Sequence, residues 1–347
     1  MTDASAARRR VVLDPHEARL DGGDVLVLRA LGLGDALTGI APLRGVRRAW
    51  PGRRIVLAAP PAVGEWLAGL GVVDAVLSTE GLRPAWCQPR SPLGGGHLAV
   101  NLHGRGPESH RLVLATGAAR LVAFDSPAAG HSGPPWHPDE HEVDRWCRLV
   151  RAAGGDCSRE DLRLPAPAPE VSEADHAPSA RDAGPPVVLH PGAAAEARRW
   201  PLARWTALAR VLVEEGNRVV VTGSAAEERL CNAIVDAVAR PEVLSMAGLL
   251  DLSALSRVVA GARLVVCGDT GVAHLATAYG TPSVLLFGPT APDRWGPAID
   301  TDRHTVIWHG DGNGDPHAGV LDPALAAITV GEVATASARL LAAHGTA

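Results

Sequence analysis

The sequence predicts an α/β protein of two Rossmann-like domains, each built around a parallel sheet. At 347 residues the chain exceeds the roughly 250–300 residues over which one hydrophobic core keeps growing, so two domains are expected. Short runs of β-branched residues and leucine alternate with amphipathic segments, a pattern typical of parallel sheets covered by helices. A proline-rich stretch separates two such sets of segments.

Four apolar runs in the first half are predicted to be strands. They are Val25–Leu28, Ile55–Ala58, Leu98–Leu102 and Leu121–Phe124. A helix is expected from Glu140 to Ala153, and the six prolines between residues 165 and 186 indicate an interdomain linker. The expected first domain therefore covers residues 1–165, and the linker covers residues 166–186.

The second half repeats this organisation over residues 187–329. Its predicted strands are Val187–His190, Arg218–Thr222, Leu264–Cys267 and Val284–Phe287. Thr329 and Glu332 have the spacing of a capping box, which predicts a closing helix from Val330 to Ala343 within the C-terminal segment 330–347. Whether this helix packs back on the first domain is left open.

The composition indicates a soluble, cytoplasmic protein. A formal net charge of −5 with scattered arginines argues against nucleic acid as a partner. No apolar run approaches the roughly 18–20 residues of a membrane span, and no signal-peptide stretch follows Met1–Arg10, although peripheral membrane contact stays open. The five cysteines form no CxxC pair, which favours reduced thiols over a zinc site.

The first candidate site follows the first predicted strand. Gly32 and Gly34 permit a tight turn and leave Asp35 at the start of a helix that is expected to reach Trp50. Because ligands of doubly wound sheets bind beyond the carboxyl ends of the strands, Asp35 can act there as a general base. A purely structural role as helix N-cap is the alternative.

Two loops of the second half carry candidate polar contacts. Arg198 and Arg199 precede a helix, where a merely structural cation pair would oppose the helix dipole, and guanidinium groups match phosphate oxygens. Glu227 follows another predicted strand and can accept hydrogen bonds from ribose hydroxyls. The dipole at a helix start explains Glu227 and Glu228 equally well, so both readings stay open.

The most specific segment joins a buried strand to a helix through Asp269, Thr270 and Gly271. Free backbone N–H groups and the positive dipole end of such a helix form an anion site suited to a diphosphate. Thr270 adds a hydroxyl donor, and Gly271 lets a ligand approach the backbone. His274 lies one helical turn beyond Thr270, either as a ligand-binding residue or as a structural histidine.

These segments together resemble glycosyltransferase family 9, the bacterial heptosyltransferase family of lipopolysaccharide core synthesis. The resemblance spans both halves, and its ordered matches are more specific than any one motif. The matching pieces are Gly34-Asp35 with Pro42 and Leu43, Pro191-Gly192 leading to Arg199-Trp200-Pro201, Gly223 with Glu227, Gly268-Asp269-Thr270-Gly271 through His274-Leu275-Ala276, Gly280-Thr281-Pro282, Leu286-Phe287-Gly288-Pro289-Thr290 and Trp295-Gly296-Pro297.

The resemblance implies a GT-B fold, in which two Rossmann-like domains face each other across a cleft. It also implies inverting, metal-independent transfer from a nucleotide diphosphate sugar, usually ADP-heptose, with no further cofactor. By position, Asp35 matches the catalytic base and Glu227 falls near a ribose-binding glutamate, while Asp269, Thr270, Gly271 and His274 match donor contacts. Arg198 stands where the family commonly has lysine, and its fork is not isosteric with an ammonium.

The acceptor is expected against the first domain and can be a glycan, a lipid-linked sugar or a small molecule. His103 and Arg105 lie in a polar loop there, and an ordinary solvated loop is the alternative. Trp86 or Trp136 can stack on a sugar, but most tryptophans are core or rim residues. A GT-B-type nucleotide-sugar epimerase and a catalytically silent binding module are the rival functions; an oxidoreductase is disfavoured because the first turn lacks the GxGxxG spacing.

Overall fold

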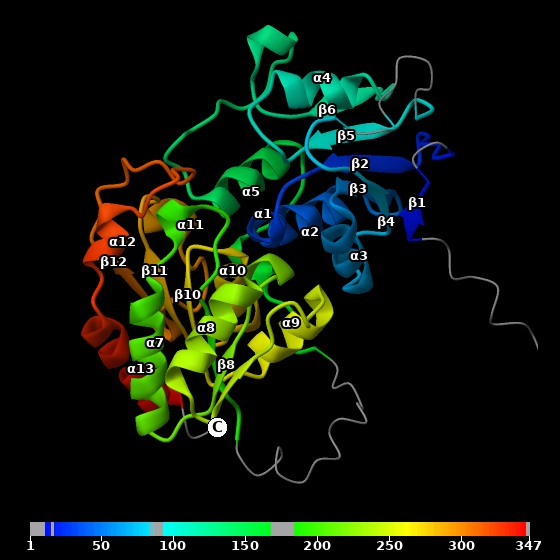
Figure 1. The fold of residues 1–347 in the computed structure, drawn as a ribbon. Coiled ribbons are helices and arrows are strands. Elements are labelled where there is room, and N and C mark those ends of the chain that lie inside the picture. The colour runs from blue at the N-terminus through cyan, green and yellow to red at the C-terminus, as the bar shows by residue number, and fades with distance from the viewer. Residues whose placement is uncertain (1–10, 15–16, 84–85, 87–92, 168–183, 345–347) are drawn as a thin grey trace, which may run out of the picture. The chain divides into compact units, whose positions relative to one another are not determined.

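The computed structural model describes residues 11–14, 17–83, 86, 93–167 and 184–344 of the chain. The chain divides into two compact units, Met1–Leu162 and Arg163–Ala347, which are described separately below (Figure 1). The amino-terminal tail, Cys87 and residues 168–183 of the expected linker lie outside the described residues. Cys147, Cys157, Cys231 and Cys267 are buried free thiols.

The first unit contains a parallel six-stranded sheet in the order β1-β4-β3-β2-β5-β6. Its strands are β1 Val12–Leu13, β2 Asp24–Leu28, β3 Arg54–Ala59, β4 Ala75–Ser78, β5 Leu98–Asn101 and β6 Arg120–Val122. Its helices are α1 Leu33–Thr38, α2 Ile40–Ala49, α3 Pro61–Gly69, α4 Glu108–Leu114 and α5 Glu142–Ala152, with 3-10 turns at Pro127–Ala129 and Arg159–Leu162.

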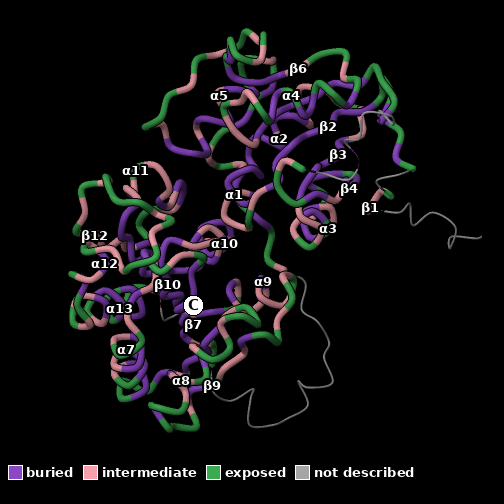
Figure 2. Tube along the Cα trace, turned by 45° about the horizontal axis from the view of Figure 1, so that its top comes forward, coloured by how far each residue is buried: buried purple, intermediate pink, exposed green. Residues whose placement is uncertain are grey.

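The central strands β2 and β5 of this first sheet are buried along their whole length, as expected where helices cover both faces of a sheet (Figure 2). On one face, Leu26 and Leu28 of β2 share a core cluster with Leu112 and Val113 of α4. Helices α2 and α5 pack against each other in the same unit. The single helix expected to reach Trp50 is two helices, because the chain breaks at Gly39 between α1 and α2.

The second unit contains another parallel six-stranded sheet, in the order β12-β11-β10-β7-β8-β9. Its strands are β7 Val187–His190, β8 Val219–Val221, β9 Val243–Ser245, β10 Leu264–Gly268, β11 Ser283–Phe287 and β12 His304–Trp308. Its helices are α7 Leu202–Glu214, α8 Glu228–Val238, α9 Leu252–Ala260, α10 Gly271–Tyr279, α11 Pro292–Trp295, α12 Pro323–Ala327 and α13 Val330–His344, with 3-10 turns at Glu196–Arg198, Ala225–Glu227 and Thr301–Arg303.

The closing helix α13 belongs to the core of the second unit. Its buried residues Val333 and Leu340 share one cluster with Leu208 of α7 and with inward-facing residues of β7, β10 and β11. The predicted capping box is confirmed: the Thr329 N–H donates to the Glu332 carboxylate at 2.8 Å, and the Glu332 N–H donates back to the Thr329 hydroxyl at 3.2 Å. These contacts of α13 all lie inside the second unit.

Candidate functional site

The sheet topology marks one place in each unit where a ligand is expected. In the first unit the chain runs outward from β2 through β3 to β4 and then returns to β5 on the other side of β2. In the second unit the same reversal falls between β7 and β10. Ligands of doubly wound sheets bind at such switch points, beyond the carboxyl ends of the strands. The predicted site residues follow β2, β5, β7, β8 and β10, at or beside these switch points.

Asp35 lies at the switch point of the first unit, in the first turn of α1. Gly32 is the N-cap residue of this helix, so the alternative interpretation of Asp35 as N-cap is wrong. The Asp35 side chain is 29% exposed, and its Oδ1 lies 3.7 Å from Nη2 of Arg29, whose own side chain is only 2% exposed. A carboxylate that is partly open to solvent and lies next to a buried cation can stay ionised and still reach a substrate.

The loop after β5 is built around a buried amide. The Asn101 side chain accepts a hydrogen bond from the His103 N–H at 2.9 Å and contacts Ser109 and His110, which are buried and structural. Burial, together with the positive charge of Arg29, lowers the pKa of His103 to about 4, so its imidazole is neutral at pH 7. Arg105 is exposed in the same loop.

In the second unit, Arg198 lies at the N-terminus of α10. Its Nη1 donates to the backbone oxygen of Asp269 at 3.1 Å and is 3.9 Å from the carboxylate Oδ2 of the same residue. Thr270 is the N-cap residue, but its side chain does not cap the helix. Within the described residues, Nε of Arg198 and the hydroxyl oxygen of Thr270 are buried without a hydrogen-bond partner. A cation and a helix N-terminus therefore converge here, as an anion site requires.

Glu227 lies beside the loop that follows β7. Its Oε2 accepts hydrogen bonds from the N–H and hydroxyl of Ser224, both at 2.8 Å, so Glu227 takes part in a capping box, a structural role that the sequence did not predict. Its other oxygen faces Gly192, where an added Cβ would lie only 2.0 Å from Oε1. His190 donates to or accepts from Thr222 at 3.0 Å, and burial lowers its pKa against the opposing negative charge of Glu227. The β7 and β8 loops thus meet around this carboxylate.

The other two predicted donor residues have different neighbours. Arg199 donates to the Ala193 carbonyl at 2.9 Å and pairs with Glu196, so its described contacts stay within its own loop. His274 is half-buried on α10, and its ring meets the Trp295 ring edge to face with centroids 6.0 Å apart. The structure therefore joins Arg198 to the Asp269–Gly271 turn but gives Arg199 no described contact there.

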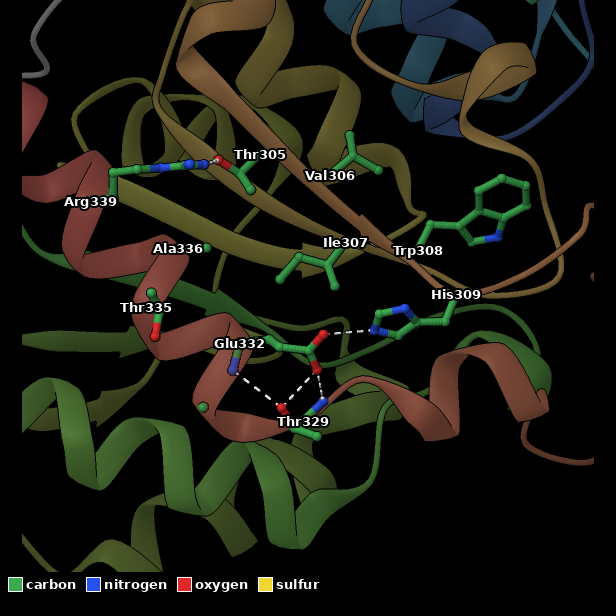
Figure 3. Close-up of a pocket in the computed structure, with 11 residues that line it drawn as sticks. Thr305, Val306, Ile307, Trp308, His309, Thr329, Glu332, Thr335, Ala336 and Arg339 are labelled. Carbon is green, nitrogen blue, oxygen red and sulfur yellow. Dashed lines mark hydrogen bonds and ion pairs between the residues drawn. The ribbon is translucent and has the colours of Figure 1, made fainter.

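A groove of about 680 Å³ lies elsewhere in the second unit, between β12 and α13 (Figure 3). It is lined by Trp308, His309, Glu332 and Arg339 among others, and none of the predicted site residues contributes to it. Among the described residues, no group of three or more His, Cys, Asp or Glu side chains is arranged to hold a metal ion. In that same part of the chain, no helix is long and apolar enough to cross a membrane.

Two tryptophans considered for sugar stacking have different environments. Trp86 is 3% exposed and donates to the Ser78 carbonyl at 3.2 Å, so it is a core residue. Trp136 is half-buried, and the Arg145 guanidinium lies over its ring, 4.4 Å from the centroid. Sequence reasoning missed Arg29 altogether. Its only signal was an arginine directly after an apolar strand and before the glycine-rich turn.

Two doubly wound sheets, each with polar loops at its switch point, define the class of two-domain α/β proteins that includes the GT-B glycosyltransferases. The chain belongs to glycosyltransferase family 9 (heptosyltransferase), whose family model matches residues 132–317, more than half of its length. That match contains Arg198, Glu227 and the Asp269–Gly271 turn, whereas Asp35 lies outside it.

Known relatives agree with this assignment. Lipopolysaccharide heptosyltransferase 2 of Escherichia coli K12 is 30% identical over 162 residues, which is 44% of this chain and 47% of that protein. The chain therefore aligns with about half the length of this curated relative. The solved structure of E. coli ADP-heptose lps heptosyltransferase II superimposes with a TM-score of 0.69 at 22% identity and covers 93% of this chain and all of the other. The iron-containing dodecameric glycosyltransferase TibC from enterotoxigenic E. coli also matches, with a TM-score of 0.57 at 16% identity over 94% of this chain and 78% of the other.

Proposed function

We propose that this protein is an inverting, metal-independent glycosyltransferase that moves a heptose-like sugar from a nucleotide diphosphate donor to an acceptor hydroxyl. ADP-heptose is the proposed donor, because the family and its matched relatives point to that class. The observation that carries the proposal is the Arg198 guanidinium at the N-terminus of α10, within the part of the chain that matches the family. We place the reaction in the cytoplasm, where nucleotide sugars are made.

The second unit binds the donor in this proposal. The N–H groups at the start of α10 and the Arg198 guanidinium receive the diphosphate, and Oε1 of Glu227, beside Gly192, accepts from the ribose. Two of the described buried polar atoms without a hydrogen-bond partner, Arg198 Nε and the Thr270 hydroxyl, lie at this turn, and each gains a partner when a phosphate binds. Asp269 and His274 contact the donor sugar, and Arg199 supplements the positive field from its own loop.

The first unit supplies the base. The acceptor oxygen attacks the anomeric carbon while Asp35 takes its proton, and the bond between that carbon and the diphosphate oxygen breaks. The negative charge that develops on the leaving nucleoside diphosphate is stabilised by Arg198 and the helix N-terminus, which replace a divalent metal. One displacement at carbon inverts its configuration. His103 and Arg105 bind the acceptor, with His103 acting as a neutral hydrogen-bonding group.

A screen of nucleotide diphosphate sugars by mass spectrometry tests the donor. Binding and slow hydrolysis of ADP-heptose, with weaker binding of UDP- and GDP-sugars, are expected; tighter binding of another nucleotide would reject the ADP assignment. Isomerisation of the donor without acceptor would instead support the epimerase alternative. Binding without any turnover, with acceptor extracts present, would support a silent module.

Metal independence is tested by assaying donor turnover in excess EDTA after exhaustive dialysis. Because arginine and backbone N–H groups supply the positive field in this proposal, turnover is expected to stay within about twofold of the untreated enzyme. Loss of turnover that returns with added Mg²⁺, Mn²⁺ or Fe²⁺ would contradict it. The configuration of the product, read by NMR of the anomeric proton, tests inversion.

A further inference from the structure

A buried cation, the guanidinium of Arg29, lies beside the Asp35 carboxylate. The Arg29 side chain follows β2 directly and is 2% exposed, although a buried charge is costly unless other groups compensate it. Its partners come from three separate places in the first unit. Nε donates to the Asp35 carbonyl, Nη1 to the Leu102 carbonyl, and Nη2 to Thr38 at 2.9 Å and Glu142 at 3.2 Å.

Arg29 is held in one conformation from every side. Its guanidinium carbon lies 5.2 Å from the centroid of the Trp146 ring. A Cβ at Gly39, between α1 and α2, would lie only 2.8 Å from Cδ and Nε of Arg29. Gly39 has an ordinary backbone conformation, with φ −79°, so the close approach of Arg29 rather than the turn requires a glycine here.

Glu142 anchors this cation from the far side. It is buried at the start of α5, where Oε1 accepts from Arg29 and from Trp146 at 2.5 Å, and Oε2 accepts from Arg145. The charged and titratable groups described around Arg29 are thus Asp35 from α1, Glu142 and Arg145 from α5, and His103 from the loop after β5. Arg29 lies between two carboxylates, one buried and one partly exposed.

We propose that Arg29 is the positioning residue of the Asp35 carboxylate, and that Glu142 and Gly39 serve to hold Arg29 in place. Arg29 fixes the backbone of Asp35 by donating a hydrogen bond to the Asp35 carbonyl. The positive charge of Arg29 holds the Asp35 carboxylate. Glu142 offsets part of that charge. The inference rests on the proposed role of Asp35 as the base and extends it to three residues that do not touch a substrate.

The direct test is a pH titration of the Asp35 carboxyl carbon, followed by NMR of the full-length protein labelled with ¹³C-aspartate. The Asp35 signal is assigned by its absence from the spectrum of Asp35→Asn. Arg29→Met is expected to raise the titration midpoint of Asp35 by about one to three pH units, since an adjacent cation favours the carboxylate by that much. Glu142→Gln keeps an oxygen that can accept from Arg29 but removes the opposing negative charge, so it is expected to lower the midpoint. Arg29→Lys keeps the charge and is expected to fall between wild type and Arg29→Met.

The opposite signs of the first two shifts distinguish this role from a structural one, which would lower the melting temperature without moving the midpoint. Arg47→Met is the matched control, because Arg47 pairs with Asp74 at the surface of the same unit, and it is expected to leave the midpoint unchanged. An unchanged midpoint in Arg29→Met, or shifts of the same sign in Arg29→Met and Glu142→Gln, would overturn the proposal. Should Arg29→Met not fold, an unchanged or raised midpoint in Glu142→Gln overturns it alone.

Kinetics then separate the two proposals. The assay uses ADP-heptose as donor and heptose-free lipopolysaccharide as the acceptor probe. Arg29→Lys is expected to lower kcat about ten- to a hundredfold, because a displaced Asp35 carboxylate is poorly placed to take the proton of the acceptor hydroxyl. The Kd for ADP is expected to stay unchanged. Turnover that survives Asp35→Asn would remove Asp35 as the base while the NMR shifts still stand. If the titration midpoint of Asp35 does not shift as expected although Asp35→Asn is inactive, only the role of Arg29 is rejected.

Discussion

Replacing the Asp35 carboxylate by an amide separates the chemistry of this residue from its structural contacts. Arg29 donates to the backbone carbonyl of Asp35, and this contact does not depend on the side chain, so Asp35→Asn is expected to fold normally. Transfer is expected to fall by roughly 100- to 10,000-fold, the range typical of losing a general base, with the Kd for ADP unchanged.

Steady-state kinetics and calorimetry on Asp35→Asn check this prediction. Asp144→Asn is the matched control, because that carboxylate belongs to the same unit and pairs with Arg159 at the surface. Its turnover should equal that of wild type. Transfer by Asp35→Asn within a few-fold of wild type would remove this carboxylate from the mechanism.

A buried histidine makes the second unit sensitive to acid. Burial lowers the pKa of His304 to about 4 from an ordinary value near 6.5, while its Nδ1 hydrogen-bonds Ser283 at 2.8 Å. The unfolded chain therefore binds a proton in a pH range where the folded one does not, and stability falls as pH falls from 6.5 towards 4. The upper bound on this loss is about 3 kcal/mol.

His304→Gln removes the titrating group, so its denaturation midpoint is expected to depend less on pH between 6.5 and 4 than that of wild type. Urea unfolding at several pH values measures this difference. His309→Gln is the control, because His309 is 40% exposed and pairs with Glu332 at the surface. Parallel pH profiles for wild type and His304→Gln would contradict the prediction.

At the residue scale the sequence predicted candidate site residues at strand ends, but not the buried residues that contact and position them. Asp35 and Asp269 could be found because each follows a glycine in a strand-to-helix turn. Arg29 could not, since its partner Glu142 lies 113 positions further along the chain and only the fold brings them together. The same applies to the placement of Glu227 against Gly192, which no local spacing encodes.

At the element scale most of the central strands were predictable, whereas four of the remaining strands were not. β7 matches its prediction at both ends, and β2, β3, β10 and β11 match within one residue. β1, β4, β9 and β12 were missed. β1 and β9 have only two and three residues, and β12 is only partly buried along most of its length, so none of these three strands carries the continuous buried run of a central strand.

The contact between the β7 and β8 loops can be broken with one methyl group. A Cβ at Gly192 would lie 2.0 Å from Glu227 Oε1, and Glu227 is held by Ser224. Gly192→Ala is therefore expected to displace Glu227 from its capping box, to cost about 1 kcal/mol of stability and to weaken ADP binding as much as Glu227→Ala is expected to.

Thermal unfolding and calorimetry with ADP check Gly192→Ala. The control is Gly331→Ala in α13, where an added Cβ meets nothing within 4 Å. That change is expected to stabilise the protein by about 0.5–1 kcal/mol, because alanine is the better helix former, and to leave ADP binding unchanged. Gly192→Ala with wild-type ADP affinity would show that Glu227 does not contact the nucleotide.

At the scale of the whole molecule, each of the two units has its own hydrophobic core. The cluster around Leu26 and Leu28 lies in the first unit, and the cluster around Leu208 and Leu340 lies in the second. The division falls between Leu162 and Arg163, a few residues before the predicted linker. A high proline content indicates a segment that does not pack in a helix or sheet. The boundary between the two units instead lies where contacts with the first core end and contacts with the second begin.

Two cores predict two unfolding transitions, only one of which responds to the nucleotide. All proposed donor contacts belong to the second unit, so ADP at 100 times its Kd is expected to stabilise that unit by about 2.7 kcal/mol and to raise its melting temperature by roughly 5–10 °C. Leu208→Ala and Leu28→Ala, both at fully buried positions, identify the transitions, since each should lower its own unit's melting temperature. Differential scanning calorimetry measures both. If ADP raised the transition that Leu28→Ala lowers, the donor would bind the first unit, and the assignment of Arg198 and the Asp269–Gly271 turn to the diphosphate would be wrong.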